Sequence, residues 1–225
     1  MATYPDIIAI GDIHGCALSN HALLKKLDNE YNDKPTYVFL GDYTDRGPDS
    51  KKVVEQLIKF NKDHECVFLK GNHDQMLLDA YEKGDWNLWL SNGGNTTLKN
   101  YDSSPGDFKL PKDHYEFFKS TELYWETEDY FFVHGGISPD LTIPENLDSE
   151  YEREQFIWQR DHVYARTNNW SKTVVFGHTP VKEPIVEENM LGIDTGCVYK
   201  KKGYGVLTAV ALPEMKFIEQ NCLDF

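Results

Sequence analysis

The chain has 225 residues, which predicts one domain over residues 1–225 with a single sizeable hydrophobic core. Acidic residues outnumber basic ones by 37 to 23, and the formal charge of −14 excludes a general nucleic-acid binder, because such a surface repels a phosphate backbone. No apolar run of about 18 residues is present and residues 1–6 show no signal-like stretch, so we expect a cytoplasmic protein without membrane contact. The sequence leaves the oligomeric state open, and a monomer is the default expectation.

Short apolar runs alternate with amphipathic segments in the first third of the chain. The runs at 7–10, 37–40 and 66–69 are rich in β-branched, aromatic and leucine side chains and are predicted to be buried strands. Residues 17–27 and 50–61 carry apolar side chains at helical spacing and are predicted to be helices. This β-α-β-α-β order predicts a partly parallel sheet covered by helices.

The rest of the chain is predicted to consist of a helical part followed by a β-rich part. Residues 74–121 are predicted to be mostly helical, with loops at 92–95 and 103–106. The second half is β-rich, with strands expected at 130–133, 173–176, 190–193, 205–212 and 215–218. The longest surface loop is expected at 139–148. No linker divides the chain, and the fold class is therefore α/β (α+β).

Five of the predicted strands end in polar segments that contain glycine. These segments are GDIHG at 11–15, GDYTDRG at 41–47, GNHD at 71–74, HGG at 134–136 and GHT at 177–179. Any one of them alone is more often a surface turn than a site. Because ligand sites in α/β sheets lie beyond the carboxyl ends of the strands, five such segments in order predict one shared site.

The residue types at these strand ends suit a centre with two metal ions. Asp12 and His14 are two positions apart in an extended segment, so their side chains point the same way and can hold one ion. Asp42 has two carboxylate oxygens and can bridge both ions. The second ion would gain an amide oxygen and two imidazoles, from Asn72, His134 and His178. A nitrogen and oxygen set without cysteine suits manganese, iron or zinc.

The four cysteines and the four histidines outside the motifs are interpreted as packing or surface residues. The cysteines are scattered and form no Cys-x-x-Cys pair, so each is interpreted as a small core-filling thiol: Cys16, Cys66, Cys197 and Cys222. The remaining histidines have no comparable motif around them: His21, His64, His114 and His162.

The five motifs resemble those of the phosphoprotein phosphatase (PPP) family, a branch of the calcineurin-like metallophosphoesterases. The resemblance spans the whole chain, and the segment FIWQRD at 156–161 is most similar to bacterial and bacteriophage serine/threonine phosphatases. It implies a central β-sandwich flanked by helices, with two divalent metal ions at the strand ends. Manganese is the expected ion in vitro, with iron or zinc as alternatives.

The resemblance also implies roles for individual residues. The first ion would be held by Asp12, His14 and Asp42, and the second by Asp42, Asn72, His134 and His178. Arg46 and Arg160 would bind phosphate oxygens, and His73, paired with Asp45, would be the general acid. Asp74 stands where many eukaryotic members have glutamate, and residues 196–205 do not align securely, so no role is assigned there.

The activity that the resemblance implies is hydrolysis of a phosphoprotein or phosphopeptide by a serine/threonine protein phosphatase. Water activated by two metal ions would attack phosphorus directly. The alternative is a dinucleoside polyphosphate hydrolase acting on diadenosine tetraphosphate, because those enzymes share the scaffold and GNHD, and some of them retain the aspartate found here at Asp45. A binding protein on an inactive scaffold is disfavoured, because His73, Arg46 and the six ligands are all present.

Overall fold

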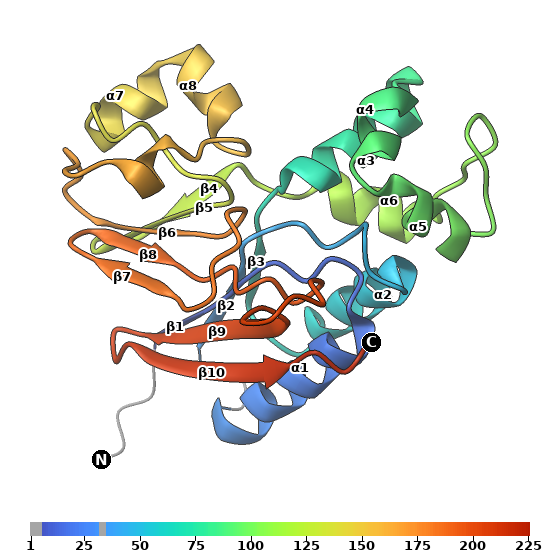
Figure 1. Cartoon of the computed structure of the whole chain (residues 1–225), viewed down its shortest axis with the longest axis horizontal. Helices are drawn as coiled ribbons and strands as arrows, with labels where there is room; N and C mark the ends of the chain where they lie inside the picture. Colours follow the sequence, from blue (N-terminus) through green and yellow to red (C-terminus); the bar gives the residue numbers. More distant parts are fainter. Residues whose placement is uncertain (1–5, 32–34) are drawn as a thin grey trace.

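The computed structural model describes residues 6–31 and 35–225, so most of the N-terminal segment, at 1–5, lies outside the described residues. Two five-stranded sheets pack together, and helices cover their outer sides (Figure 1). Within the described part of the chain, no helix has the length and apolar character needed to cross a membrane.

The first sheet has the strand order β10-β9-β1-β2-β3. Its parallel strands are β1 (Ile7–Ile10), β2 (Thr36–Phe39) and β3 (Cys66–Phe68). Its antiparallel side consists of β9 (Val206–Leu212) and β10 (Lys216–Asn221). The parallel strands are joined by the predicted helices, α1 (Ala17–Tyr31) and α2 (Ser50–Phe60).

The second sheet has the order β4-β5-β6-β8-β7. Its three central strands are parallel: β5 (Tyr130–Val133), β6 (Thr173–Phe176) and β8 (Met190–Gly192). Its antiparallel edges are β4 (Tyr124–Glu126) and β7 (Ile185–Glu187). The sequence did not predict these two edge strands.

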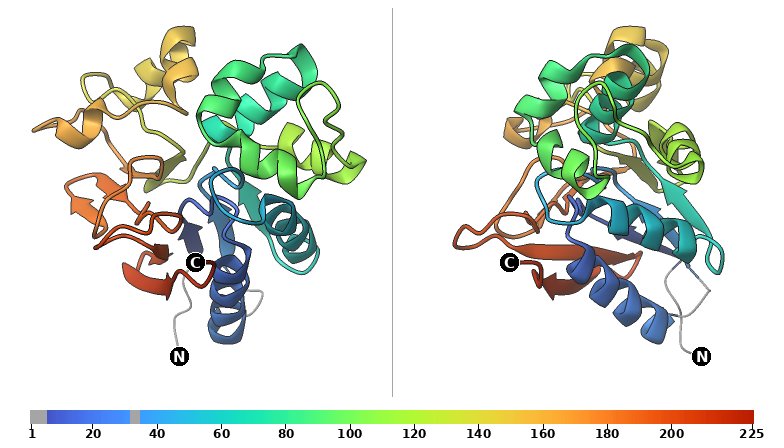
Figure 2. Two further views of the ribbon diagram at one scale, coloured as in Figure 1. Left: turned by 45° about the vertical axis from the view of Figure 1, so that its right-hand side comes forward. Right: turned by 90° about the vertical axis from the view of Figure 1, so that its right-hand side faces the viewer.

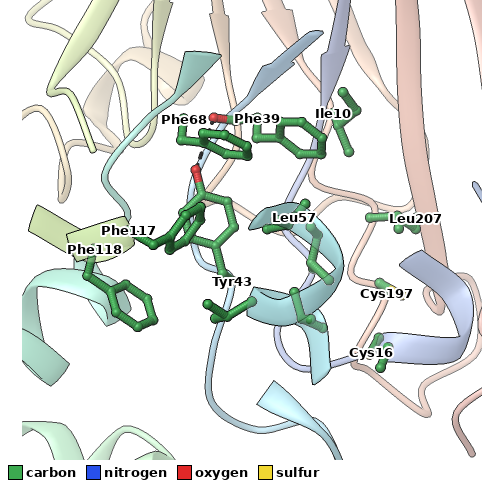
Figure 3. Close-up of a cluster of buried hydrophobic side chains, with 14 of the residues drawn as sticks. Ile10, Cys16, Phe39, Tyr43, Leu57, Phe68, Phe117, Phe118, Cys197 and Leu207 are labelled. Carbon is green, nitrogen blue, oxygen red and sulfur yellow. Dashed lines mark hydrogen bonds between the residues drawn. The ribbon is translucent and has the colours of Figure 1, made fainter. Parts of the chain in front are cut away.

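The alternation of side chains along the strands divides the core into layers. In β1, Ile7 and Ala9 pack between the sheets against residues such as Phe132 of the second sheet, whereas Ile8 and Ile10 face the helices. Figure 3 shows part of that helix-facing cluster, where the Tyr43 hydroxyl donates a hydrogen bond to the Phe39 carbonyl at 3.4 Å. A third cluster covers the outer face of the second sheet. The predicted β-sandwich flanked by helices is therefore confirmed.

The α-helices that follow α2 form two separate groups beside the sheets. One group follows the first sheet and consists of α3 (Asn72–Lys83), α4 (Trp86–Ser91), α5 (Gly94–Asn100) and α6 (Lys112–Lys119). The other consists of α7 (Ile143–Asp148) and α8 (Glu150–Gln155). Figure 2 shows the first group in green and the second in yellow. The helical character predicted for 74–121 is confirmed, although α5 already begins inside the expected loop at 92–95.

The loop predicted at 139–148 is wrong, because α7 occupies its second half. Thr142 caps this helix by accepting a hydrogen bond from the backbone N–H of Glu145, and the Glu145 carboxylate accepts one from the Thr142 N–H at 2.8 Å. Pro144 lies in the first turn, where its missing N–H costs no helical hydrogen bond.

Candidate metal centre

Six strand ends meet at one place, three from each sheet. They are the carboxyl ends of the parallel strands β1, β2, β3, β5, β6 and β8. The buried polar residues that follow them are Asp12 and His14, Asp42, Asn72, His134, His178 and Asp194. The structure thus brings together all six metal ligands expected from the sequence, at the edge where open α/β sheets place their ligands.

Asp42 lies at the middle of this group. Its Oδ2 is 3.3 Å from Nε2 of His14, and its Oδ1 is 3.4 Å from Nε2 of His134. Nε2 of His134 is also 3.1 Å from Oδ1 of Asn72. Oδ1 of Asp42 accepts the backbone N–H of His73 at 3.0 Å, so the carboxylate lies at the N-terminus of α3. The two carboxylate oxygens therefore face imidazoles on two sides, as a bridging ligand requires.

Backbone carbonyls orient two of the imidazoles. Nδ1 of His14 lies 2.8 Å from the Thr44 carbonyl, and Nδ1 of His134 lies 2.7 Å from the Leu40 carbonyl. Because a carbonyl can only accept, each Nδ1 carries the proton and each Nε2 keeps its lone pair when the ring is neutral. Burial lowers the pKa of both histidines and favours that neutral form. Both Nε2 atoms can then act as metal ligands.

The donor set as a whole fits divalent cations. Burial, together with the nearby carboxylates of Asp194 and Asp42, raises the pKa of Asp12. Crowded buried carboxylates and imidazole lone pairs are costly unless a cation neutralises them. Two sets of three potential ligands have their ligand atoms within 4.8 Å of one another and share Asp42: His14, Asp42 and His73, and Asp42, His134 and His178. Divalent ions held here would activate water and neutralise charge on a phosphate group.

Backbone strain is concentrated at this centre. Eight non-glycine residues in the described part of the chain have positive φ angles, and five of them belong to the predicted site. These are His14 (46°), Asp42 (53°), Asp45 (71°), Arg46 (67°) and His178 (61°). Left-handed backbone is unfavourable for residues with a Cβ and is retained where the surrounding structure enforces it.

Two glycines allow carboxylates to approach the backbone closely. A Cβ on Gly71 would lie 2.1 Å from Oδ1 of Asp42, and a Cβ on Gly177 would lie 2.1 Å from Oδ1 of Asp12. The Asp12 carboxylate also accepts the backbone N–H of His178, with distances of 3.2 and 3.1 Å to its two oxygens. This bond connects the end of β1 in one sheet to the end of β6 in the other, so it fixes the two halves of the centre relative to each other.

His73 and Asp45 form the pair that the resemblance implied. Nδ1 of His73 lies 2.7 Å from Oδ2 of Asp45, and both side chains are buried. Asp45 also accepts hydrogen bonds from Nε1 of Trp89, at 2.8 and 3.0 Å, and from the hydroxyl of Thr97 at 2.6 Å. Burial raises the pKa of Asp45, whereas these hydrogen bonds act in the opposite direction. Asp45 thus receives support from α4 and α5 while it orients His73.

The two predicted phosphate-binding arginines lie in segments that connect strands of different sheets. Arg46 follows β2 of the first sheet, and Arg160 lies between β5 and β6 of the second. Nη1 of Arg46 lies 2.8 Å from Nε2 of His14 and donates to the Tyr199 hydroxyl at 3.3 Å. Nη2 of Arg160 donates to the carbonyl of His178 at 3.3 Å. Both guanidinium groups therefore contact the ligand residues directly. Tyr199 belongs to the segment 196–205, to which the sequence assigned no role.

Asp194 is a site residue that the sequence analysis missed. It follows β8, is buried, and accepts the backbone N–H of Gly196 at 2.9 Å. Burial raises its pKa to about 7, and the nearby Asp42 carboxylate contributes in the same direction. A signal was present, because Asp194-Thr195-Gly196 is another polar, glycine-containing segment at a predicted strand end.

Asp74 has a structural role that its position in GNHD did not reveal. Its buried carboxylate accepts backbone N–H groups from Asp42 at 2.8 Å, Gly71 at 3.0 Å and Tyr43 at 3.2 Å. These three bonds connect the segment after β2 to the segment after β3. Asp74 therefore fixes the backbone that carries Asp42.

Solved structures share this fold. A crystal structure provisionally assigned as a diadenosine tetraphosphatase superposes with a TM-score of 0.71 at 22% identity, covering 99% of this chain and 96% of that one. A serine/threonine phosphatase from Saccharomyces cerevisiae superposes with a TM-score of 0.63 at 15% identity, covering 98% and 82%. Identities this low support the fold alone.

Among the curated relatives of this chain is the asymmetrical bis(5'-nucleosyl)-tetraphosphatase PrpE of Anoxybacillus flavithermus. It is 30% identical over 93% of this chain and 91% of its own length. The PrpE of Oceanobacillus iheyensis is 29% identical over 93% and 89%. The calcineurin-like phosphoesterase family matches residues 5–207. With this match and the metal-ligand geometry, the chain belongs to the calcineurin-like phosphoesterase family, as a hydrolase that acts on phosphate esters.

Proposed function

We propose that this protein is a bis(5'-nucleosyl)-tetraphosphatase that cleaves its substrate asymmetrically. The observation that carries the proposal is the similarity to PrpE proteins along nearly the whole length of both chains. The relatives thus favour the alternative drawn from the sequence over the serine/threonine protein phosphatase that was its main prediction. Asymmetrical cleavage of a tetraphosphate bridge produces a nucleoside triphosphate and a nucleoside monophosphate.

The site contains the protein groups that this reaction needs. Arg46 and Arg160 present planar guanidinium forks that can bind phosphate oxygens in a bidentate manner. A water molecule forms the new bond to phosphorus, and the anhydride bond on the opposite side breaks. His73, held by Asp45, donates a proton to the leaving phosphate oxygen. Divalent ions held by the six predicted ligand residues would activate the water and neutralise negative charge on the phosphate bridge.

Charge determines which residues must attract a polyphosphate substrate. The formal charge of the chain is −14, so a highly anionic substrate is repelled by the protein as a whole. Attraction must therefore be local, from Arg46, Arg160 and bound cations. We expect KM for diadenosine tetraphosphate to depend strongly on both arginines, with Arg166 as a control, because it lies outside the centre and lines a different cavity.

Product analysis tests the proposal. Metal-stripped protein is reloaded with Mn²⁺ and incubated with diadenosine tetraphosphate, and the nucleotides are separated by anion exchange. Equal amounts of ATP and AMP are expected. Two molecules of ADP per substrate would contradict asymmetrical cleavage. An intact dinucleotide, together with rapid release of phosphate from a phosphoserine peptide, would instead identify a protein phosphatase.

A further inference from the structure

Three of the four cysteines meet at one place behind the catalytic loops. Cys16 precedes α1, Cys197 follows β8 and Cys222 follows β10, yet their three sulfur atoms lie within 4.8 Å of one another. Cys16 and Cys197 are buried, and Cys222 is half-buried. Figure 3 shows Cys16 and Cys197 close together at the margin of the helix-facing cluster. The interpretation of these three as separate core-filling thiols is therefore incomplete.

The C-terminal tail is held in this position by contacts that do not involve sulfur. The carboxylate of Asp224 accepts the backbone N–H groups of Leu18 at 2.9 Å and Ser19 at 3.0 Å, at the start of α1. The Ser19 hydroxyl in turn accepts the backbone N–H of Leu223 at 2.9 Å. Cys222, next to Leu223, is thus placed against the other two thiols independently of any bond between them.

We propose that Cys16, Cys197 and Cys222 form a second metal site, which binds one thiophilic divalent ion such as Zn²⁺ or Cd²⁺. In a tetrahedral site with Zn–S bonds of about 2.3 Å, neighbouring sulfur atoms are about 3.8 Å apart. Sulfur atoms already within 4.8 Å need only a small contraction to reach this spacing. Each coordinating thiol gives its proton to the solvent as the ion binds. Because Cys222 is only half-buried, the metal ion can reach the three sulfur atoms from the side of Cys222.

The chemistry of the ligands separates this site from the catalytic centre. All predicted ligands of the catalytic centre are nitrogen or oxygen atoms, whereas this group offers three sulfur atoms, which select soft ions. Cys16 directly follows the GDIHG segment that contains His14, and Cys197 follows the segment that contains Asp194. An ion here would therefore connect the C-terminal tail to two loops that carry the catalytic centre, and stabilise them.

Cadmium titration tests the site by a signal that only sulfur ligands produce. Metal-free, full-length protein in a phosphine reductant is titrated with Cd²⁺, and the ultraviolet charge-transfer band of cadmium thiolate is followed. We expect the band to saturate at one equivalent in the wild type. Cys66→Ser is the matched control, because Cys66 is a partly buried free cysteine outside the group, and it should keep the full band.

Cys197→Ser and Cys222→Ser should each lose most of the band. Cys222 is half-buried, so its variant is the decisive one if the buried Cys197→Ser fails to fold. Circular dichroism and Mn²⁺-dependent hydrolysis establish that Cys222→Ser is folded. No band in the wild type, a band of undiminished size in folded Cys222→Ser, or an equal loss in Cys66→Ser would each overturn the proposal and return these residues to core packing.

The melting temperature provides a second way to distinguish metal binding at this site from metal binding at the catalytic centre. In the Asp42→Asn background, where the catalytic centre is impaired, one equivalent of Zn²⁺ should still raise the melting temperature. The same addition should have no such effect in the Asp42→Asn, Cys222→Ser double variant. Equal shifts in the two proteins would contradict a thiol site.

Discussion

The Asp42 side chain contacts both halves of the catalytic centre, through His14 on one side and His134 on the other. Replacing it by asparagine removes the charge and one of the two oxygens. Asp42→Asn should therefore retain less than half of the Mn²⁺ bound by the wild type after desalting, as measured by elemental analysis. Asp102→Asn is the control, because Asp102 is another positive-φ aspartate in an exposed turn. Full occupancy in Asp42→Asn would exclude a bridging role.

His73 provides the test of proton transfer. Its Nδ1 is engaged by Asp45, which leaves Nε2 to act on the substrate. His73→Asn should lower kcat by about 10² to 10⁴-fold, because general acid catalysis contributes on that order, while metal content stays unchanged. His21→Asn, at an exposed position, should match the wild type. If His73→Asn also lost its metal, the residue would be a ligand and the acid assignment would fail.

We expect His162 to make the folding stability depend on pH. Among the described residues, its two ring nitrogens find no hydrogen-bond partner, and burial lowers its pKa from 6.5 to about 4. The folded state disfavours the proton that the unfolded state binds below pH 6.5, so stability falls as the pH drops from 6.5 to 4. The loss is up to about 3 kcal/mol at 1.36 kcal/mol per pKa unit.

Urea unfolding between pH 4.5 and 7.5 measures this effect. His162→Leu should flatten the dependence of the unfolding free energy on pH in this range, whereas His21→Gln should leave it unchanged. An undiminished slope in His162→Leu would show that other groups cause the acid sensitivity.

At the scale of elements, α4 acts on the centre through the indole N–H of one residue, Trp89. Nε1 of Trp89 donates to both oxygens of Asp45, which orients His73. Trp89→Phe keeps the aromatic packing and removes the donor, so kcat should fall about ten-fold, as expected for a positioning residue around a metal centre. Trp86→Phe is the matched control in the same helix, because Trp86 packs against Trp89 and Phe108. Equal rates for the two variants would show that α4 contributes packing only.

Local sequence patterns predicted the elements whose causes are local. The apolar runs of β1 and β5 are mostly buried and were recognisable as strands, whereas the edge strands β4 and β7 are short and only partly buried. The helix α7 was missed because it lies inside the surface loop predicted at 139–148. Its signal was nevertheless present, since threonine and glutamate three residues apart form a capping box.

At the scale of the molecule, the centre depends on the packing of two sheets. Each sheet contributes three strand ends, and the hydrogen bonds from His178 to Asp12 cross between them. The motifs at five of these ends were readable from the sequence. The side chains that support these motifs could not be predicted from the sequence. Trp89 is 44 residues away from Asp45 along the chain, and Tyr199 is 153 residues away from Arg46. Such contacts arise only from the tertiary fold.

A comparison of two substrates tests the central claim most directly. Metal-stripped protein reloaded with Mn²⁺ is assayed for kcat/KM on diadenosine tetraphosphate and on a phosphoserine peptide, in the wild type and in His73→Asn. We predict a preference for the dinucleotide of at least about 100-fold, or about 2.7 kcal/mol in transition-state stabilisation, and a large loss in His73→Asn. A preference for the phosphopeptide would contradict the proposed substrate while leaving the metal centre intact, and activity on neither would contradict the account as a whole.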